Sequence, residues 1–305
     1  VGTILDYSIE GKTTDEDFEQ TVEIIIQTIQ EGINNKNIPF AVFKVTGIGS
    51  INLLEKASDQ NCILNESQIL ELEGIKNRIE RICAAAHTAM IPVFIDAEES
   101  WIQAIIDCWA LEMMLKYNLE KAIVYNTLQM YRHDRFAFLK EALNIAKEHQ
   151  IIYGIKLVRG AYMEKERERA SKMNYPSPIQ ANKEATDHDF NAALDFIIEN
   201  LKDFALVAGT HNEESSAYLA AKITEKGLDQ KDDKLFFAQL LGMSDHISFN
   251  AANSGLNVAK YLPFGPVKDV LPYLFRRAEE NTSVEGQTGR ELGLITKELD
   301  RRKNA

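Results

Sequence analysis

Cysteine is scarce in this sequence, and its few cysteines form no close pair. The 305 residues include only Cys62, Cys83 and Cys108, which are odd in number and far apart. A disulfide framework and a Cys-x-x-Cys redox motif are therefore excluded. We expect three buried thiols in a protein of a reducing compartment.

Long apolar runs and surplus positive charge are also missing. No run approaches the roughly 20 apolar residues that span a bilayer, and no basic and apolar leader follows Val1. The formal net charge of -12 argues against a nucleic-acid partner and against attraction to anionic lipid headgroups. An anionic ligand would therefore have to be held by a local basic cluster.

The motifs of several common catalytic centres are absent as well. The six histidines show no His-x-x-x-His or carboxylate spacing typical of zinc sites. No Gly-x-Ser-x-Gly or cysteine-based arrangement predicts a nucleophile. We therefore expect neither a metal site nor covalent catalysis by serine or cysteine.

The sequence does contain a regular alternation of two kinds of segment. Short apolar, β-branched runs alternate with segments of helical period, without an internal repeat. The expected strands are Thr3–Tyr7, Ala41–Val45, Val93–Ile95, Ala122–Tyr125, Gly154–Val158, Ala205–Ala208, Leu235–Ala238 and Val258–Leu262. The expected helices include Thr14–Gly32, Leu64–Met90, Ser100–Tyr117, Phe136–His149, His188–Asn200 and Glu213–Lys226. The expected loops are Asn174–Lys183 and Asp229–Lys234.

This alternation predicts an α/β protein. Eight strands in strict β/α order, with no break in composition, predict one (β/α)8 TIM barrel over residues 1–305. A doubly wound open sheet is the alternative, less favoured because no phosphate-binding fingerprint follows the first strand. Gly47 and Gly49 follow the second strand, but a single Gly-x-Gly is more typical of a turn.

In such a barrel the active site lies at the C-terminal ends of the strands. The polar residues expected there are Asp6, Glu10, Lys44, Thr46, Asp96, Glu98, Asn126, Gln129, Lys156, Arg159, Tyr162, Thr210, His211, Asn212 and Tyr261. Each alone could instead form a salt bridge or a helix cap. Lys44 and Lys156 stand in apolar strands, where an unpaired charge is costly. A functional role is favoured for them, with a buried ion pair as the alternative.

The stretch after Tyr261 predicts a turn and then a helix with an unusual polar face. Tyr273, Arg276, Arg277 and Glu280 fall at i, i+3, i+4 and i+7, so they share one side of that helix. Adjacent guanidinium groups suit a carboxylate or phosphate held at two points. In the alternative interpretation, the glutamate simply pairs with the arginines on a solvated face.

These residues indicate a small zwitterionic or anionic substrate, but they do not fix the reaction. A Schiff-base aldolase that uses Lys44 or Lys156 fits the same set of residues. So does a barrel that binds a ligand without catalysis.

Five longer motifs narrow the choice. They are Leu5-Asp-Tyr-Ser-Ile-Glu10, Phe94-Ile-Asp-Ala-Glu98, Leu157-Val-Arg-Gly-Ala-Tyr162, Gln239-Leu-Leu-Gly-Met243 and Tyr273-Leu-Phe-Arg-Arg-x-x-Glu-Asn281. In type and order, and over essentially the whole chain, they resemble the signatures of FAD-dependent proline dehydrogenase. The resemblance is to monofunctional, mitochondrial-type members more than to the bacterial bifunctional enzyme. It implies a distorted (β/α)8 barrel whose last helix lies over the C-terminal mouth.

The resemblance also implies residues that contact the substrate. They are Glu10, Lys44, Asp96, Leu157, Tyr162, Tyr261, Tyr273, Arg276 and Arg277. The arginines and the lysine would bind the carboxylate, and the tyrosines and the leucine would surround the pyrrolidine ring. The aspartate would orient the tyrosines and basic groups, and Glu10 would pair with Arg276 as a gate.

A second set would contact FAD. It comprises Gln129, Lys156, Val158, Gly160, Ala161, Thr210, His211, Asn212, Arg277 and Glu280. Gln129 and Lys156 would touch the isoalloxazine edge, and the backbone around Gly160 would approach the flavin closely. The Thr210–Asn212 stretch would hold the phosphate and adenosine end.

The activity implied by the resemblance is oxidation of L-proline to Δ1-pyrroline-5-carboxylate in proline catabolism, with electrons passing from FADH2 to a quinone. A separate pyrroline-5-carboxylate dehydrogenase would act next, because no aldehyde dehydrogenase domain follows in this sequence. The implied location is the cytoplasmic face of a bacterial inner membrane or the matrix side of mitochondria, with peripheral membrane contact. A hydroxyproline dehydrogenase of the same family is the alternative.

Overall fold

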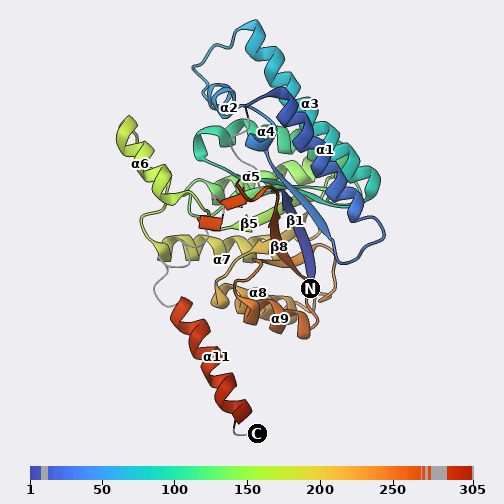
Figure 1. Cartoon of the computed structure of the whole chain (residues 1–305), viewed down its shortest axis with the longest axis vertical. Helices are drawn as coiled ribbons and strands as arrows, with labels where there is room; N and C mark the ends of the chain where they lie inside the picture. The colour runs from blue at the N-terminus through green and yellow to red at the C-terminus, as the bar shows by residue number, and fades with distance from the viewer. Residues whose placement is uncertain (8–12, 269, 272–273, 276–286, 304–305) are drawn as a thin grey trace.

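The computed structural model describes residues 1–7, 13–268, 270–271, 274–275 and 287–303, and its elements are labelled in Figure 1. Eight parallel strands close into a barrel in chain order, from β1 to β8, with β8 paired to β1. The strands are β1 Gly2–Tyr7, β2 Phe40–Lys44, β3 Val93–Asp96, β4 Val124–Gln129, β5 Tyr153–Val158, β6 Phe204–Gly209, β7 Leu235–Leu240 and β8 Val258–Phe264. All eight expected strands are present, and the closed barrel excludes the doubly wound alternative.

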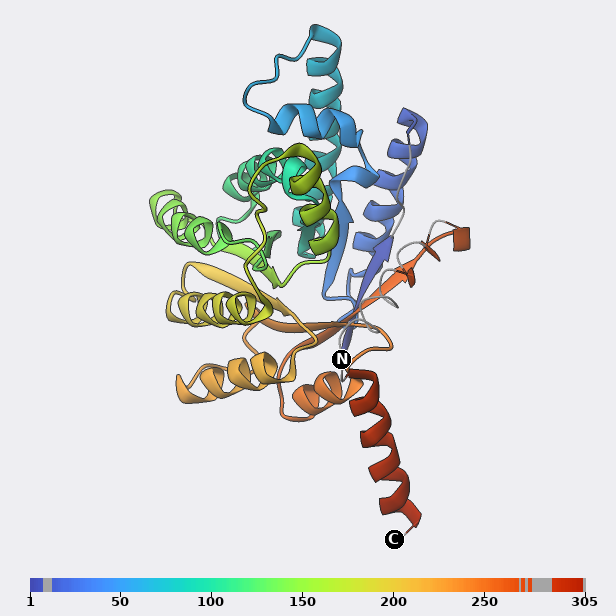
Figure 2. The same cartoon turned by 90° about the vertical axis from the view of Figure 1, so that its left-hand side faces the viewer.

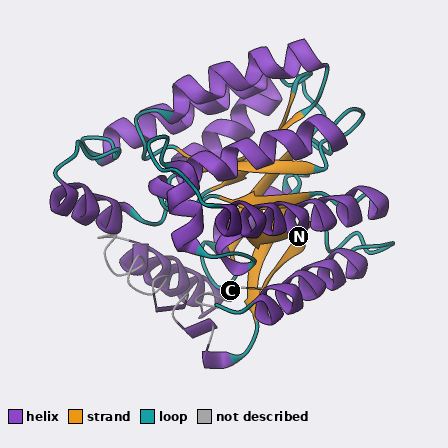
Figure 3. Cartoon of the chain, turned by 90° about the horizontal axis from the view of Figure 1, so that it is seen from above, coloured by secondary structure: helices purple, strands orange, loops and turns teal. Residues whose placement is uncertain are grey.

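Helices surround this barrel, as the view from above shows (Figure 3). They are α1 Asp15–Glu31, α2 Ile51–Ser58, α3 Glu66–Ala89, α4 Ser100–Tyr117, α5 Arg135–His149, α6 Met163–Met173, α7 Lys183–Glu199, α8 Glu213–Glu225, α9 Asp245–Asn253 and α11 Gln287–Lys303. Figures 1 and 2 both show α11 extending away from the barrel. The helix expected over the mouth includes residues 269, 272–273 and 276–281, which lie outside the described residues.

Two element boundaries differ from those predicted by more than two residues. The fourth strand was expected to end at Tyr125 but continues to Gln129. Its later residues are polar yet buried with partners: the Asn126 amide donates to Asp107 (2.8 Å), and the Thr127 hydroxyl donates to the Ile95 carbonyl (2.9 Å). Such residues do not show the apolar pattern of a buried strand, so the prediction stopped too early.

The other boundary lies before α7, which was expected to begin at His188 and begins at Lys183. The Asn182 side chain accepts from the Ala185 backbone N–H at 2.8 Å and thereby caps the helix start. Helices α2, α6, α9 and α11 were not among the helices expected.

The core has two layers, one on each side of the sheet. The larger layer lies between strands and helices, and the smaller one fills the barrel interior. Inside, the Phe40 ring stacks on Phe94 with centroids 4.6 Å apart and meets Tyr125 edge-on at 5.8 Å. Gly154 leaves space for this packing, because a Cβ there would lie 2.7 Å from the Tyr125 ring. The lower half of the barrel is therefore a packed apolar plug, and any site must lie above it.

The prediction that the cysteines are free thiols is confirmed, whereas the prediction that all three are buried is wrong for two of them. All three cysteines are free, and only Cys83 is buried. Cys62 is half-buried, and Cys108 is exposed on α4, where its thiol faces Glu112. Among the described residues, no helix has the length and apolarity to cross a bilayer.

Candidate active site

The site is built by strand alternation at the C-terminal half of the barrel. Side chains two residues apart on a strand share a face, so Lys44 follows the interior residue Val42, and Asp96 follows interior Phe94. The parallel register then pairs Lys44 with Asp96 across β2 and β3. On β2 and β3 the interior thus changes from apolar side chains to charged groups within two residues.

Lys156 on β5 is the centre of this upper layer. Its ammonium group donates to the Asp96 carboxylate of β3 and, at 2.7 Å, to the Tyr261 hydroxyl of β8. It also lies 4.7 Å from the Tyr261 ring centroid and 5.5 Å from that of Phe94. The lysine is only 5% exposed. Because an unpaired charge at such a depth is costly, the ion pair and the ring faces together hold the ammonium group inside the barrel.

Glu98, two residues beyond Asp96, ties three strand ends together. Its carboxylate accepts from the backbone N–H of Thr46 at 3.1 Å and from the Thr46 hydroxyl. Its carbonyl accepts from the Gln129 side chain at 2.7 Å. Burial raises the pKa of Glu98 to about 7, although the Thr46 bonds and the nearby charge of Lys44 favour the ionised form. The β3–α4 turn therefore fixes the ends of β2 and β4, which carry Lys44 and Gln129.

The segment from β5 to α6 makes a close backbone approach at Gly160. Its φ of +127° is a conformation that L side chains rarely adopt, and a Cβ there would lie 2.6 Å from the Tyr131 ring. The backbone N–H of Tyr131 donates to the Arg159 carbonyl at 2.7 Å, which holds the two segments together. The Tyr131 hydroxyl is buried without a hydrogen-bond partner among the described residues. Glycine at this position therefore lets the β5–α6 turn pack directly on the Tyr131 ring.

Arg159 joins the same segment to the end of β6. Its guanidinium donates to Asp187 (2.6 Å), to the Thr210 hydroxyl (2.7 Å) and to the Ser215 hydroxyl (2.9 Å). It also lies 4.3 Å from the Phe190 ring centroid. Burial lowers its pKa, while the Asp187 carboxylate opposes that shift.

The three polar residues after β6 make ordered local contacts. The Asn212 side chain accepts from the Ser215 backbone N–H at 2.9 Å and caps α8. A helix cap was the alternative role expected for each polar residue at a strand end. His211 Nδ1 lies 3.0 Å from the Ser244 hydroxyl, and the Leu240 N–H donates to Nε2 at 3.4 Å. Their expected contact with a cofactor stays a prediction.

The structure brings some predicted residues together and separates others. Asp96, Lys156 and Tyr261 meet directly, while Lys44 and Gln129 adjoin them through Glu98. Leu157 does not join this group: it is fully buried in the helix-facing core layer. It alternates with the inward-facing Lys156, and its expected contact with the substrate stays a prediction.

Other predicted residues are placed only in part or not at all. Tyr162 stands between β5 and α6, and Val158, the last residue of β5, is partly exposed. The predicted site residues that lie outside the described ones are Glu10, Tyr273, Arg276, Arg277 and Glu280. The roles expected of all these residues stay predictions.

Three residues that help to build the candidate active site were not assigned a role from the sequence. They are Glu98, Arg159 and Tyr131. Glu98 and Arg159 were noted at strand ends but given no role, since nothing in the sequence names their partners. Their positions inside the motifs Phe94–Glu98 and Leu157–Tyr162 were the available signal. Tyr131 carried no signal, because its contact with Gly160 arises only where β4 and β5 pair.

Comparison with known proteins assigns the chain to a protein family. A family model described as "Proline dehydrogenase" matches residues 1–290. Proline utilization A from Bdellovibrio bacteriovorus superposes with a TM-score of 0.79 over 93% of this chain and 30% of that one, at 19% identity. At that identity the likeness concerns the fold, a distorted (β/α)8 barrel.

Sequence relatives agree with the family model. The carbapenem antibiotics biosynthesis protein CarD of Pectobacterium carotovorum is 33% identical over 99% of this chain and 78% of its own length. Proline dehydrogenase 1, mitochondrial, is 32% identical in Dictyostelium discoideum and 38% identical in Homo sapiens, over 99% and 78% of this chain. This chain spans 60% and 40% of those two proteins. It belongs to the proline dehydrogenase family, a family of oxidoreductases.

Proposed function

We propose that this chain oxidises L-proline to Δ1-pyrroline-5-carboxylate with bound FAD. The buried Lys156–Asp96–Tyr261 group at the top of the barrel carries the proposal, because it sets a cation, a carboxylate and a ring face where an amino acid would enter. The family membership supplies the substrate class. In the product the new double bond joins ring nitrogen to C5, so C5 is the carbon that loses hydride.

The residues present fit a flavin at this mouth. The buried Tyr131 hydroxyl has no partner among the described residues, and the turn at Gly160 that packs on its ring follows Val158, the residue paired with Gln129. Lys156 and Gln129 would touch the edge of the ring system, and Val158 and Ala161 would border it. Arg159 and Thr210 would face the phosphate end. When bound, FAD supplies the hydride acceptor.

The chain's own residues would position the substrate and its protons. Lys44, with Arg276 and Arg277 of the final motif, would bind the carboxylate and thereby fix the ring. The same positive charges favour loss of the ammonium proton, which must leave before hydride transfer. Asp96 offsets the charge of Lys156 and holds it against Tyr261, so that this tyrosine presents its ring to the substrate.

Electrons are expected to pass to a quinone at a membrane surface, and a separate pyrroline-5-carboxylate dehydrogenase would consume the product. The mitochondrial names of the relatives from Dictyostelium discoideum and Homo sapiens support a location beside a respiratory membrane.

An anaerobic titration tests the proposal. The full chain purified with FAD should lose its flavin absorbance as L-proline is added, and a quinone analogue should restore it. Flavin that stays oxidised at saturating L-proline would refute the function and leave the fold intact. A colourless protein trapped by borohydride with its substrate would instead indicate a Schiff-base aldolase.

A second candidate is oxidation of hydroxyproline, since the hydroxyproline dehydrogenase of Xenopus laevis is 35% identical over 83% of this chain. A pocket built for an apolar ring rejects an added hydroxyl only modestly, by roughly 1–3 kcal/mol. We expect proline to be preferred by about one to two orders of magnitude in kcat/KM. A preference for hydroxyproline would reverse the choice.

A further inference from the structure

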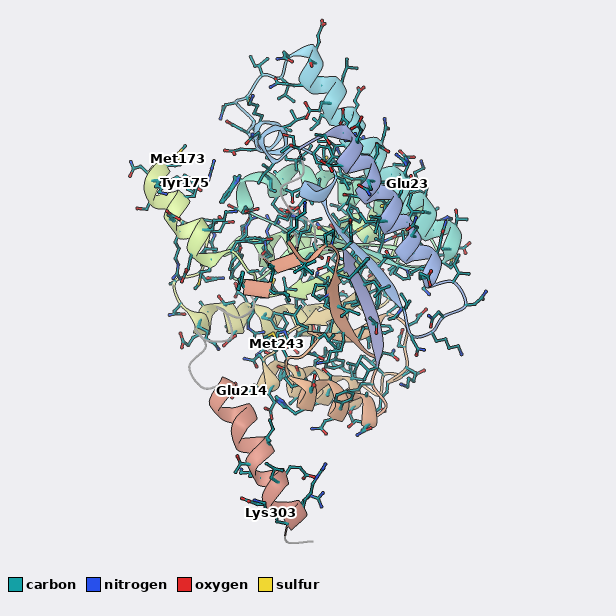
Figure 4. All side chains as sticks on the ribbon, in the orientation of Figure 1. Glu23, Met173, Tyr175, Glu214, Met243 and Lys303 are labelled. Atoms are coloured by element: carbon teal, nitrogen blue, oxygen red, sulfur yellow. The ribbon has the colours of Figure 1, made fainter. Side chains whose placement is uncertain are left out.

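Helix α6 is unusual in how little of it is apolar core. It follows Tyr162 directly, and only Glu166 and Ala170 of its residues are buried. Its sequence, MEKERERASKM, is mostly charged. Met173, at its far end, and the nearby Tyr175 lie at the edge of the molecule (Figure 4), and Met173 is 62% exposed. Polar contacts near the start of α6 therefore have to hold it.

The main contact is a carboxylate with no solvent exposure. The two oxygens of Glu166 accept from the backbone N–H and from the hydroxyl of Ser100, both at 2.6 Å. Ser100 is the first residue of α4, and its N-cap residue Glu99 makes no side-chain cap bond. Glu166 thus caps α4 from 66 residues away, at the helix end where the dipole favours negative charge. Without these bonds, burial of the carboxylate would be costly.

Two further contacts flank this cap. Lys165 pairs with Glu99, and Arg169 pairs with Glu55 of α2. The Arg169 guanidinium also lies 4.4 Å from the Trp101 ring centroid. The first two turns of α6 are thereby attached to the β3–α4 turn and its surroundings by charged groups.

The contact between Glu166 and Ser100 is linked on both sides to residues near the mouth of the barrel. The backbone N–H of Glu166 donates to the Tyr162 carbonyl at 2.9 Å, which makes Tyr162 part of the first turn of α6. On the other side, Ser100 lies two residues after Glu98, which fixes Thr46 and Gln129. These hydrogen bonds, together with the two-residue backbone step from Ser100 to Glu98, therefore connect Tyr162 to the ends of β2, β3 and β4.

We propose that Glu166 is a positioning residue for the substrate: by capping α4 from α6 it holds Tyr162 in place at the C-terminal end of β5, the strand that carries Lys156. This inference rests on the proposed function, in which Tyr162 contacts the pyrrolidine ring. A cap that served only α4 would affect stability alone. Here the weakly packed partner is α6, so loss of the bond displaces the helix that carries Tyr162.

The test compares Glu166→Ala with Glu168→Gln in the FAD-bound full chain. Glu168 lies on the same helix, is exposed and pairs only locally with Lys172. We expect Glu166→Ala to raise the KM for L-proline about tenfold and to change kcat less than threefold. It should weaken to a similar extent an unreactive analogue that has oxygen in place of the ring nitrogen, measured by its perturbation of the flavin spectrum. Glu168→Gln should match the wild type in every measurement.

Hydrogen exchange supplies a readout that needs no substrate. In Glu166→Ala, peptides covering residues 159–173 should exchange at least tenfold faster, while those of β5 should not change. Should Glu166→Ala fail to fold, the single variants Glu166→Gln and Ser100→Ala and their double variant change the same contact more mildly. Each should show the same direction of change, and the double variant should be no worse than the more affected single one.

Three outcomes decide between the explanations. A lower Tm with wild-type KM and analogue affinity would make Glu166 merely structural and overturn the inference. Unchanged exchange over residues 159–173 would overturn it as well. If L-proline fails to reduce wild-type flavin, the proposed function fails, and the exchange data alone then show whether Glu166 holds Tyr162.

Discussion

At the scale of single residues, the most informative feature is that Lys156 and Lys260 are equally buried but face opposite sides of the barrel wall. Each is 5% exposed. Lys156 points inward to Asp96 and Tyr261, whereas Lys260 donates to the Met243 carbonyl and to Asp245 on the helix side, both at 2.7 Å. Burial alone therefore does not distinguish the lysine proposed to contact the flavin from Lys260, whereas the side of the sheet that each faces does.

This pair gives a matched prediction. Lys156→Met should leave Asp96 buried without its cation, destabilise the fold by about 3–5 kcal/mol and abolish flavin reduction by L-proline. Lys260→Met should cost less stability, because its partner Asp245 is 59% exposed, and it should keep the activity. Urea unfolding and anaerobic stopped-flow reduction measure the two effects. Equal losses of activity in both variants would contradict the assignment.

Glu98 gives a prediction about pH. Its pKa rises on folding from the usual 4.5 to about 7, mainly through burial. The folded state therefore keeps a proton between these values that the unfolded state has lost, and its stability falls as pH rises through that window. The loss is on the order of 3 kcal/mol above pH 7 and vanishes below pH 4.5.

Glu98→Gln should remove that pH dependence and keep the bond from the Thr46 N–H. Its free energy of unfolding relative to wild type should improve steadily from pH 4.5 to pH 7 and then stay level. Chemical denaturation across this range measures it. A flat difference between variant and wild type would mean that Glu98 ionises normally in the fold.

At the scale of elements, the turn between β5 and α6 depends on one residue without a side chain. Gly160 combines a φ of +127° with a Cβ position 2.6 Å from the Tyr131 ring. Gly227, after α8, has a φ of +63°, but apart from its chain neighbours none of the described residues has an atom within 4 Å of its Cβ position. The two glycines therefore separate backbone strain from steric overlap.

Gly160→Ala should cost about 2–4 kcal/mol, from strain and overpacking together, and should also weaken FAD binding. Gly227→Ala should cost only about 1–2 kcal/mol and leave FAD affinity unchanged. Thermal unfolding and FAD titration of the flavin-free protein test both. Unchanged FAD affinity in Gly160→Ala would remove this turn from the cofactor site.

At the scale of the whole molecule, closure of the barrel places distant strands side by side. The net charge of -12 disfavours the approach of anionic groups, so a ligand carboxylate at the mouth would have to be held by nearby basic side chains. The apolar plug of Phe40, Phe94 and Tyr125 closes the lower end of the barrel, and ligands must enter from the C-terminal end.

A cofactor held by several strands should stabilise the whole fold. With FAD at 100 times its Kd, the free energy of unfolding should rise by about 2.7 kcal/mol, which raises Tm by roughly 4 °C for a chain of this size. Circular dichroism of the flavin-free protein with increasing FAD measures the shift. A Tm that does not depend on FAD concentration would contradict a specific flavin site.

The sequence by itself determined the class of this protein. Strand and helix periods are local properties, so β/α alternation could be found without partners, and motifs such as Leu157–Tyr162 identified the family. Local patterns also misled in places. Polar Asn126 and Thr127 obscured the end of β4, and the helix that begins at Lys183 was expected to begin at His188.

Only the tertiary structure decided which polar groups pair. Lys156 and Asp96 are 60 residues apart, and Glu166 and Ser100 are 66 apart, so no local spacing predicts either contact. Barrel closure and strand register set which strand ends meet, and burial then requires each charged group there to find a partner. The physical reason is that a buried charge is tolerated only where the fold places an opposite charge beside it. That partner comes from a distant part of the chain, so no single stretch of sequence predicts it.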